Sequence, residues 1–349
     1  MGADCARSRD NGGVGEFDLL AKIRELLPPE GHRIRVGSGD DAAVTFPGGA
    51  TATSVDALVE GVHFRREHAS LRQIGHKALA TALSDLAAMG AEPGEAYVML
   101  GVPPGLDEED CLELLRGMAA LAAETGTTLA GGDVTRAPVL TLATTVVGHA
   151  PSSELLVTRA GGRPGDTLVL TGQIGDAAAG LLILESPRAA AGIPPEFSSV
   201  MRDRQLEPRP RLAAGAALAR CGATAMIDLS DGLGGDATRL AEAGGVGIAI
   251  EAGDLPIAGF VEDVAEAAGV DFFQLAVSGG EDYELLAALP PERVDGAVEV
   301  VQETGIRLTP VGRLEEPGGV EIRLPGGELL AAVGYDQLAR PVAPRPEAP

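Results

Sequence analysis

Residues 223–251 read ATAMIDLSDGLGGDATRLAEAGGVGIAIE, and this stretch shows the alternation of strand and helix that is found along the chain. Residues 223–227 form an apolar run typical of a buried strand, and an acidic turn follows from Asp228 to Gly232. Residues 233–243 have helical periodicity, and residues 246–251 are a second strand. The acidic turn therefore ends a strand and opens a helix, a place where backbone N–H groups favour phosphate binding.

The remaining sequence also alternates strands with helices, and it has no fixed repeat. A length of 349 residues fits two domains at roughly 150 residues per domain. The connection over residues 150–166 is rich in Gly, Pro and Ser and marks a boundary. We therefore predict two domains of the α/β (α+β) class, over residues 1–150 and 151–349.

Three further expectations concern local structure, and the first two bear on the position of acidic residues. Residues 51–55 are expected to form a strand that ends at Asp56. Residues 127–130 and 139–148 are expected to form strands on either side of a Gly-Gly-Asp turn. Residues 187–210 are polar and rich in Pro, and we assign them no helix or strand.

Composition excludes some classes of partner. The 27 basic and 51 acidic residues give a formal net charge of −24, so the basic surface that nucleic acids require is missing. Phosphorylated small molecules remain compatible with this charge, because metal ions can lie between two anions. Lysine occurs only at Lys22 and Lys77, and neither lies in the G-x-x-x-x-G-K-[ST] pattern of a P-loop.

No segment of the sequence indicates export or a membrane. Cys5, Cys111 and Cys221 are far apart, which disfavours a disulfide framework or a zinc finger and fits a reducing compartment. Residues 1–13 lack the apolar run of a signal peptide, and no stretch of 18 apolar residues is present. We expect a cytoplasmic protein that binds neither nucleic acid nor membrane.

Several carboxylates lie where a cation would be needed. Asp40 and Asp41 are adjacent in a Gly-rich turn and repel each other without a partner, although an ordinary solvated turn is the alternative. In the helix expected over residues 70–89, Asp85 falls on the same side as the apolar Ile74 and Ala78. A carboxylate directed at the core needs a cation or hydrogen bonds. Oxygen-only ligands of this kind suit Mg²⁺ or Ca²⁺ rather than zinc.

The turns at Asp56, Asp133 and Asp228–Asp231 repeat this theme. Together with the Asp40–Asp41 turn and Asp85 they suggest a multi-metal phosphate site, although structural turns also use Gly and Asp. No Ser/His/Asp order is convincing, and no cysteine has a basic or histidine neighbour that would activate it. We predict that no residue acts as a covalent nucleophile.

The motifs resemble those of the thiamine-monophosphate kinase family. This family belongs to the ATP-binding superfamily that also contains aminoimidazole ribonucleotide synthetase and selenophosphate synthetase. The matching strings are VGEF (14–17), GDDA (39–42), SVD (54–56), VEGVHF (59–64), KALA (77–80), SDLAAMGA (84–91), GGD (131–133), TR (158–159), IDLSDGL (227–233) and SGGEDYEL (278–285). Their order and approximate spacing hold from about residue 15 to Leu338.

The resemblance implies that ATP phosphorylates thiamine monophosphate to thiamine diphosphate, with several Mg²⁺ ions as cofactor. It also implies a two-domain aminoimidazole ribonucleotide synthetase-like fold. Residues 1–150 would bind ATP and Mg²⁺ and form a homodimer through a strand barrel, and residues 151–349 would complete the substrate site. The implied metal ligands are Asp41, Ser54, Val55 (through its backbone), Asp56, Asp85, Asp133, Asp228 and Asp231. The implied ATP contacts are Gly132, Asp133, Arg159 and Ser230, and the implied substrate contacts are His63 and Glu281.

Two positions depart from the family pattern. Val55 stands where Thr is common, which is tolerable if that contact uses the backbone. The segment GYDQL over residues 334–338 differs from the frequent Gly-Tyr/Trp-Asp-His-Phe, and Ala332-Val333 replaces the aromatic residue that often precedes the glycine. Tyr335 is therefore the candidate that stacks on the substrate ring.

Other readings of the motifs stay open. Selenophosphate synthetase needs an early reactive cysteine followed by Lys, but no Lys follows Cys5 before Lys22. Aminoimidazole ribonucleotide synthetase is not expected to carry the 59–64 segment followed by the 84–91 segment. A nucleotide-binding hydrogenase-assembly factor would present a C-terminal cysteine, which residues 343–349 lack. A plain metal-binding scaffold would bind Mg²⁺ without turning over ATP.

Overall fold

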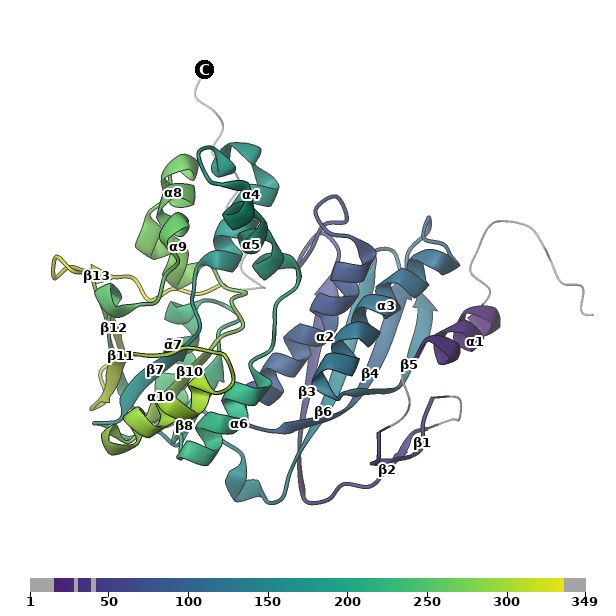
Figure 1. Ribbon diagram of the computed structural model, residues 1–349, viewed down its shortest axis with the longest axis horizontal. Helices are drawn as coiled ribbons and strands as arrows, with labels where there is room; N and C mark the ends of the chain where they lie inside the picture. The colour runs from purple at the N-terminus through teal and green to yellow at the C-terminus, as the bar shows by residue number, and fades with distance from the viewer. Residues whose placement is uncertain (1–15, 28–30, 39–41, 336–349) are drawn as a thin grey trace, which may run out of the picture. The chain divides into compact units, whose positions relative to one another are not determined.

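The protein is described by a computed structural model that covers residues 16–27, 31–38 and 42–335 (Figure 1). The described chain forms two compact units. The N-terminal unit contains the described residues up to Leu86 together with Ala91–Leu156, and the C-terminal unit contains Ala87–Gly90 and the chain from Val157 onward. The predicted metal ligand Asp41 lies outside the described residues.

The N-terminal unit is built on a mixed sheet. Its elements are α1 (Glu16–Leu26), β1 (Ile34–Val36), β2 (Val44–Thr45), β3 (Ala50–Val59), α2 (Leu71–Ala88), β4 (Glu92–Val102), α3 (Glu108–Thr125), β5 (Thr128–Arg136), β6 (Thr141–Ala150) and the 3₁₀ turn η1 (Ser153–Leu155). The described strands β3, β6, β4 and β5 form the main sheet in that order. Only the β4–β5 pair in it is parallel.

Helices α2 and α3 cover one face of this sheet (Figure 1). Ser70 caps α2 through a hydrogen bond of 3.3 Å from the Gln73 N–H, and Gln73 accepts from the Ser70 N–H in return. The two helices cross at Gly75, where any side-chain carbon would collide with the Leu114 carbonyl. The capped helix and this close crossing fix the α2 residues that face β3.

Two expectations for this unit were wrong. Strand β3 does not end before Asp56, because β6 pairs with it without a break from Ala50 to Val59. Residues Gly131–Asp133 form no turn but lie inside β5. A side-chain carbon at Gly132 would collide with the Val98 carbonyl oxygen on β4, so this glycine permits a close approach of two strands. Asp56 and Asp133 are thus held on strands.

The C-terminal unit contains a seven-stranded sheet among its described residues, in the order β13-β12-β9-β11-β7-β10-β8. The strands are β7 (Thr167–Thr171), β8 (Ala225–Asp228), β9 (Gly247–Glu251), β10 (Leu285–Leu289), β11 (Leu308–Glu315), β12 (Val320–Arg323) and β13 (Leu329–Leu330). The helices are α4 (Asp176–Glu185), α5 (Pro195–Leu206), α6 (Leu212–Cys221), α7 (Leu233–Gly244), α8 (Gly259–Ala268), α9 (Phe272–Ser278) and α10 (Val294–Gln302). Four short 3₁₀ turns in all connect the described elements, and three of them lie here, namely η2 (Pro187–Ala190), η3 (Ala252–Asp254) and η4 (Pro291–Arg293).

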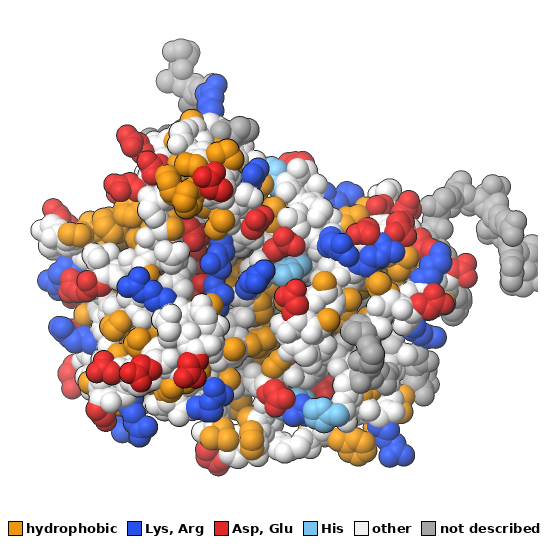
Figure 2. Space-filling view, in the orientation of Figure 1, with side chains coloured by type: hydrophobic (Ala, Val, Ile, Leu, Met, Phe, Trp, Pro, Cys, Tyr) orange, Lys and Arg blue, Asp and Glu red, His pale blue; other side chains and the backbone are white. Residues whose placement is uncertain are grey.

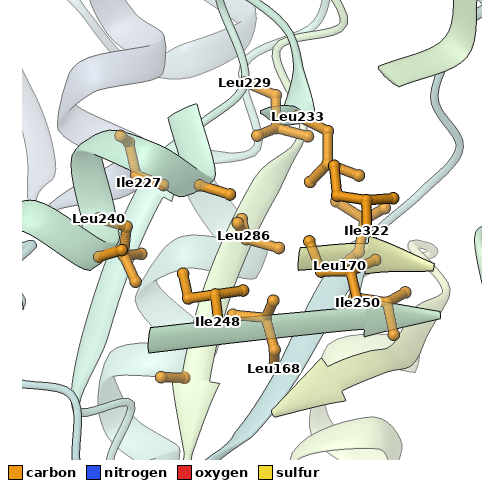
Figure 3. Close-up of a cluster of buried hydrophobic side chains, with 14 of the residues drawn as sticks. Leu168, Leu170, Ile227, Leu229, Leu233, Leu240, Ile248, Ile250, Leu286 and Ile322 are labelled. Atoms are coloured by element: carbon orange, nitrogen blue, oxygen red, sulfur yellow. The ribbon is translucent and has the colours of Figure 1, made fainter. Parts of the chain in front are cut away.

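This sheet has a hydrophobic core on each face. Alternate residues of β7 separate between the two cores: Leu168 and Leu170 belong to one, and Val169 belongs to the other. The first core packs against α7, and Figure 3 shows Leu240 of that helix beside Ile227 and Leu233 beside Ile322. The second core packs against α6 and α10. Because both faces are covered, the strand ends are held rigidly, and the acidic loops leave from these ends.

Residues 187–210 hold more structure than expected. They include η2 and the polar helix α5, which begins with Pro195 at its first position. Ser198, Met201 and Gln205 are its buried residues, spaced by three and four positions. Helix α9 was also not predicted. Helix α5 matters for the site because its last turn carries Gln205.

Charged side chains of both signs lie interspersed on the face of the protein seen in Figure 2. Most carboxylates are thus solvated, and the buried ones form a small set among the described residues. Among the described helices, none has the length and apolar composition to cross a bilayer.

The α2–α3 crossing can be tested at Gly75. We expect Gly75→Ala to lower the free energy of unfolding by about 1–3 kcal/mol, because the added methyl group overlaps the Leu114 carbonyl. Gly296→Ala in α10 is the matched control, since no atom lies within 4 Å of its added carbon. That variant should be as stable as the unmodified protein or more so, by about 0.5–1 kcal/mol. Urea unfolding gives the free energy of unfolding of both variants. Equal changes in the two variants would contradict the close approach of α2 and α3 at Gly75.

Candidate active site

Ser54 and Asp85 are brought together in the N-terminal unit. The Ser54 hydroxyl on β3 donates a hydrogen bond to the Asp85 carboxylate on α2. Asp85 is half-buried on a helix whose neighbouring residues, Ser84 and Leu86 among them, are buried. Asp56 lies two residues beyond Ser54 on the same face of β3, and its carboxylate accepts from the Ala57 N–H at 2.8 Å. These three oxygen-bearing side chains form the acidic edge of this unit.

Asp133 lies on the opposite face of the same sheet. It pairs with Met99 in the β4–β5 ladder, Met99 pairs with Ala143, and Ala143 pairs with Ala57. Paired residues project to the same face, so Asp133 shares its face with Ala57, and Asp56 points the other way. The side chain of Val55 is also on the Ala57 face, 66% exposed, which leaves only its backbone near Ser54 and Asp56.

His63 is held in one orientation by the segment that follows β3. Its Nδ1 atom accepts a hydrogen bond of 3.0 Å from the Val59 N–H, so in the neutral ring the proton is on Nε2. Nε2 is buried and has no hydrogen-bond partner among the described residues. Glu60 stabilises the segment through Arg66 at 2.6 Å and the Leu140 N–H at 3.3 Å. A buried N–H donor without a partner is available to a ligand acceptor.

In the C-terminal unit the acidic loop after β8 carries the remaining acids. Asp228 is the buried last residue of β8. Asp231 forms an ion pair with Arg239 at 2.7 Å, and its N–H donates to Asp236 at 3.0 Å. Arg239 also pairs with Asp236 at 2.7 Å. Burial raises the pKa of Asp236 to about 6, and Arg239 acts in the opposite direction. The Arg239 fork thus fixes the orientation of Asp231.

The other predicted contacts of this unit lie at its surface. The Tyr335 N–H donates to the Asp231 carbonyl at 2.9 Å, which places this residue beside the acidic loop with its side chain 52% exposed. Ser230 is half-buried, and its carbonyl accepts from the Glu281 N–H at 2.8 Å. Arg159 is exposed. Ser230, Asp231, Glu281 and Tyr335 are therefore gathered around one loop.

Glu281 is oriented by a residue that the sequence did not indicate. Gln205 at the end of α5 donates a hydrogen bond to its carboxylate. Gln205 is 5% exposed, so this amide is a fixed partner. Pro195 at the helix start and the 198/201/205 spacing were the signals that could have revealed α5.

A buried ion pair lies beneath the same segment. The Arg211 Nε donates to Glu284 at 2.7 Å, and its Nη2 pairs with the second carboxylate oxygen. Thr171 donates to Glu284 at 2.7 Å and accepts from the Leu285 N–H at 2.8 Å. Glu284 is 1% exposed, so these donors satisfy a carboxylate that water does not reach.

The acids do not form a preassembled metal cluster. Among the described residues, no group of three or more His, Cys, Asp or Glu side chains is placed to hold a metal ion. The donors that are present are carboxylate, hydroxyl and carbonyl oxygens, which fit a hard cation such as Mg²⁺. The described residues therefore supply suitable ligands, and their assignment as a metal set stays a prediction.

Comparison with known proteins defines the class first. Residues 39–150 match the N-terminal domain of AIR synthase related proteins, and residues 163–325 match the C-terminal domain. Hydrogenase maturation protein HypE in complex with ATP has the same fold, with a TM-score of 0.71 at 20% identity over 86% of this chain and 89% of that chain. The fold expected from the sequence is thus confirmed as that of AIR synthase related proteins.

Within this class, the similar proteins of known name are thiamine-monophosphate kinases. The thiamine-monophosphate kinase of Methanopyrus kandleri is 36% identical over 88% of this chain and 92% of its own length. That of Escherichia coli is 35% identical over 94% and 99%. The crystal structure of the kinase from Stenotrophomonas maltophilia has a TM-score of 0.78 at 32% identity, covering 91% of this chain and 98% of that chain. The chain belongs to the thiamine-monophosphate kinase family.

The buried ion pair makes a testable contribution to stability. We expect Arg211→Met to lower the free energy of unfolding by about 3–5 kcal/mol, because it leaves the Glu284 charge buried without its main partner. The double variant Arg211→Met, Glu284→Met should recover most of that loss. Arg313→Met, which removes an exposed pair with Glu315, is the control and should stay within about 0.5 kcal/mol. Chemical denaturation of all four proteins gives the values, and a small loss for Arg211→Met would contradict this description.

Proposed function

We propose that this chain transfers the γ-phosphate of ATP to thiamine monophosphate and forms ADP and thiamine diphosphate. The observation that carries the proposal is family membership along nearly the whole chain, with 94% of it aligned to the Escherichia coli thiamine-monophosphate kinase. The solved structure of AaThiL complexed with AMPPCP and TMP supports it, with a TM-score of 0.72 at 28% identity over 91% of this chain and 94% of that chain. AMPPCP is an analogue of ATP, so that complex pairs the two substrate types.

The proposed cofactor is Mg²⁺, in more than one copy. It would be held by oxygen ligands from Asp41, Ser54, the Val55 backbone, Asp56, Asp85, Asp133, Asp228 and Asp231. When bound, Mg²⁺ neutralises phosphate charge and orients the two substrates for in-line transfer. Ser54 keeps the Asp85 carboxylate oriented, and Arg239 does the same for Asp231.

The proposed nucleotide contacts are Gly132, Asp133, Arg159 and Ser230. Gly132 is exposed on β5, and Arg159 is exposed and carries positive charge. Both features support an approach by phosphate groups. The acceptor phosphate of thiamine monophosphate is already ionised near neutral pH, so it needs no strong general base. No residue is proposed as a covalent nucleophile.

The proposed contacts to thiamine monophosphate are His63, Glu281 and Tyr335. The unpartnered Nε2–H of His63 supports a hydrogen bond to a substrate acceptor. Gln205 holds the Glu281 carboxylate, which is suited to a cationic or N–H-bearing ring. The exposed Tyr335 ring beside the acidic loop is available for stacking.

We also propose a cytoplasmic homodimer whose N-terminal strands face each other. The support is the open face of the N-terminal sheet, opposite to α2. Its β3 residues Thr51, Thr53, Val55 and Ala57 are exposed, although they are mostly apolar or small. A sheet face of this composition is typical of a surface that a partner covers.

The reaction is tested by an ADP-release assay with ATP, Mg²⁺ and one acceptor at a time. The acceptors are thiamine monophosphate, thiamine and aminoimidazole precursors. We expect ADP release when thiamine monophosphate is the acceptor and none with the other acceptors. ADP release with thiamine only would indicate a different thiamine enzyme. ADP release with none of the acceptors would indicate a protein that binds its ligands without catalysing phosphate transfer.

Asp85 tests the metal site. We expect Asp85→Asn to reduce kcat by at least ~100-fold with the fold intact, because the amide can still accept from Ser54 but supplies no charge. Asp263→Asn, at an exposed position of α8, is the control and should keep the unmodified kcat. A near-normal kcat for Asp85→Asn at saturating Mg²⁺ would rule out Asp85 as a metal ligand.

The dimer is tested at the centre of the open face. Thr145 pairs with Val55 and Tyr97 there. We expect Thr145→Arg to give monomers in sedimentation velocity, because the change would bury an unpaired guanidinium between two copies. Val139→Arg, in an exposed loop, should leave the dimer intact. A monomeric unmodified protein, or a Thr145→Arg dimer, would contradict the proposal.

A further inference from the structure

The loop of residues 279–284, here named the Glu281 loop, is fastened along its backbone to the loop after β8. The Glu281 N–H donates to the Ser230 carbonyl at 2.8 Å, and the Tyr283 N–H donates to the Leu229 carbonyl at 2.9 Å. The Leu229 N–H donates in return to the Glu284 carbonyl at 2.8 Å. Alternate residues of the loop thus pair with the acidic loop, and Asp282 lies between two of them.

The backbone of this loop is strained on both sides of Asp282. Glu281 has φ of +59° and Tyr283 has φ of +49°. These are the non-glycine residues with positive φ in the described part of the chain. A left-handed conformation at two side-chain-bearing residues persists only where surrounding contacts impose it. Backbone contacts to Ser230 and Leu229 hold Glu281 and Tyr283, and both contacts come from the loop after β8.

Asp282 has an anchor on a different segment. Its Oδ1 accepts from the Gly175 N–H at 3.0 Å, and the Ala177 N–H also donates to its carboxylate. These N–H groups belong to the start of α4, whose preceding residue Gly175 provides no side-chain cap. Asp282 therefore caps α4 from a position 107 residues away in the sequence.

The surroundings of Asp282 favour its neutral form. Burial raises the pKa of Asp282 well above its usual range, and the nearby carboxylates of Glu284 and Asp176 act in the same direction. Its Oδ2 is buried without a hydrogen-bond partner among the described residues. An asparagine side chain would keep the acceptor for the Gly175 N–H and, like the neutral acid, would carry no charge. The anchor therefore depends on the shape and acceptor of this side chain.

We propose that Asp282 is a positioning residue for thiamine monophosphate binding, which it supports by tying the loop that carries Glu281 to the start of α4. With Asp282 in place, Glu281 is fixed at its backbone by Ser230 and at its carboxylate by Gln205. Without it, the strained backbone relaxes and the Glu281 carboxylate moves. The inference rests on the proposed function and on the proposed contact of Glu281 with that substrate.

The test compares Asp282→Ala with Asp282→Asn in steady-state kinetics with ATP and thiamine monophosphate. We expect Asp282→Ala to raise KM for thiamine monophosphate at least tenfold while KM for ATP stays within twofold. Asp282→Asn should restore both KM values to within threefold of the unmodified protein. If Asp282→Ala yields no folded protein, Asp282→Ser is used, because its shorter side chain cannot reach the Gly175 N–H and the same rise is expected.

Asp166→Ala is the matched control. Asp166 is a buried aspartate of the C-terminal unit that precedes β7, and its carboxylate accepts from the Arg163 N–H at 3.0 Å and the Thr224 hydroxyl at 2.6 Å. The Asp166→Ala variant should have a lower thermal unfolding midpoint but unchanged KM values for both substrates, because the native Asp166 holds segments that lie away from Glu281. An Asp282→Ala protein with unmodified KM values, or with equal rises for both substrates, would overturn the inference while the function stands. An unmodified protein that does not phosphorylate thiamine monophosphate would overturn the proposed function itself.

Discussion

Repulsion between negative charges is the constraint on which this protein is organised. The chain carries a net charge of −24, and its proposed substrates are both anions. Coulomb repulsion between carboxylates and phosphates grows as water is excluded from a site. The described structure reduces this repulsion locally by giving its acids fixed partners, such as Ser54 for Asp85 and Arg239 for Asp231. What these partners leave uncompensated is the charge that Mg²⁺ would neutralise.

Placement of the acids depends on parts of the fold that carry no chemistry. In the C-terminal unit, two hydrophobic cores hold both faces of the sheet, so β8 and β10 end at fixed places. Buried Arg211 fixes Glu284 at one end of the Glu281 loop, and Asp282 fixes its middle. The two strained residues, Glu281 and Tyr283, flank Asp282. The strained backbone costs some folding free energy, and in return it holds Glu281 in one orientation.

Sequence patterns predicted the elements whose signals are local. The α2 cap at Ser70, the strand–turn–helix around Asp228 and the family motifs were all readable, and the family is confirmed. The strand positions of Asp56 and Asp133 were not, because cross-strand pairing with β6 and close approach to β4 overrode the turn signal of Gly and Asp. Gln205 was missed because α5 is polar and its partner Glu281 is 76 residues away. The metal, nucleotide and substrate roles of the individual residues remain predictions.

We propose that the acidic residues hold phosphate groups only through a metal ion. The most direct measurement is the affinity of the unmodified protein for ATP by isothermal titration calorimetry, with Mg²⁺ present and with Mg²⁺ removed by a chelator at equal ionic strength. We expect ATP binding to weaken by at least ~100-fold without Mg²⁺, because carboxylates then face phosphates directly. Equal affinity in the two conditions would contradict it.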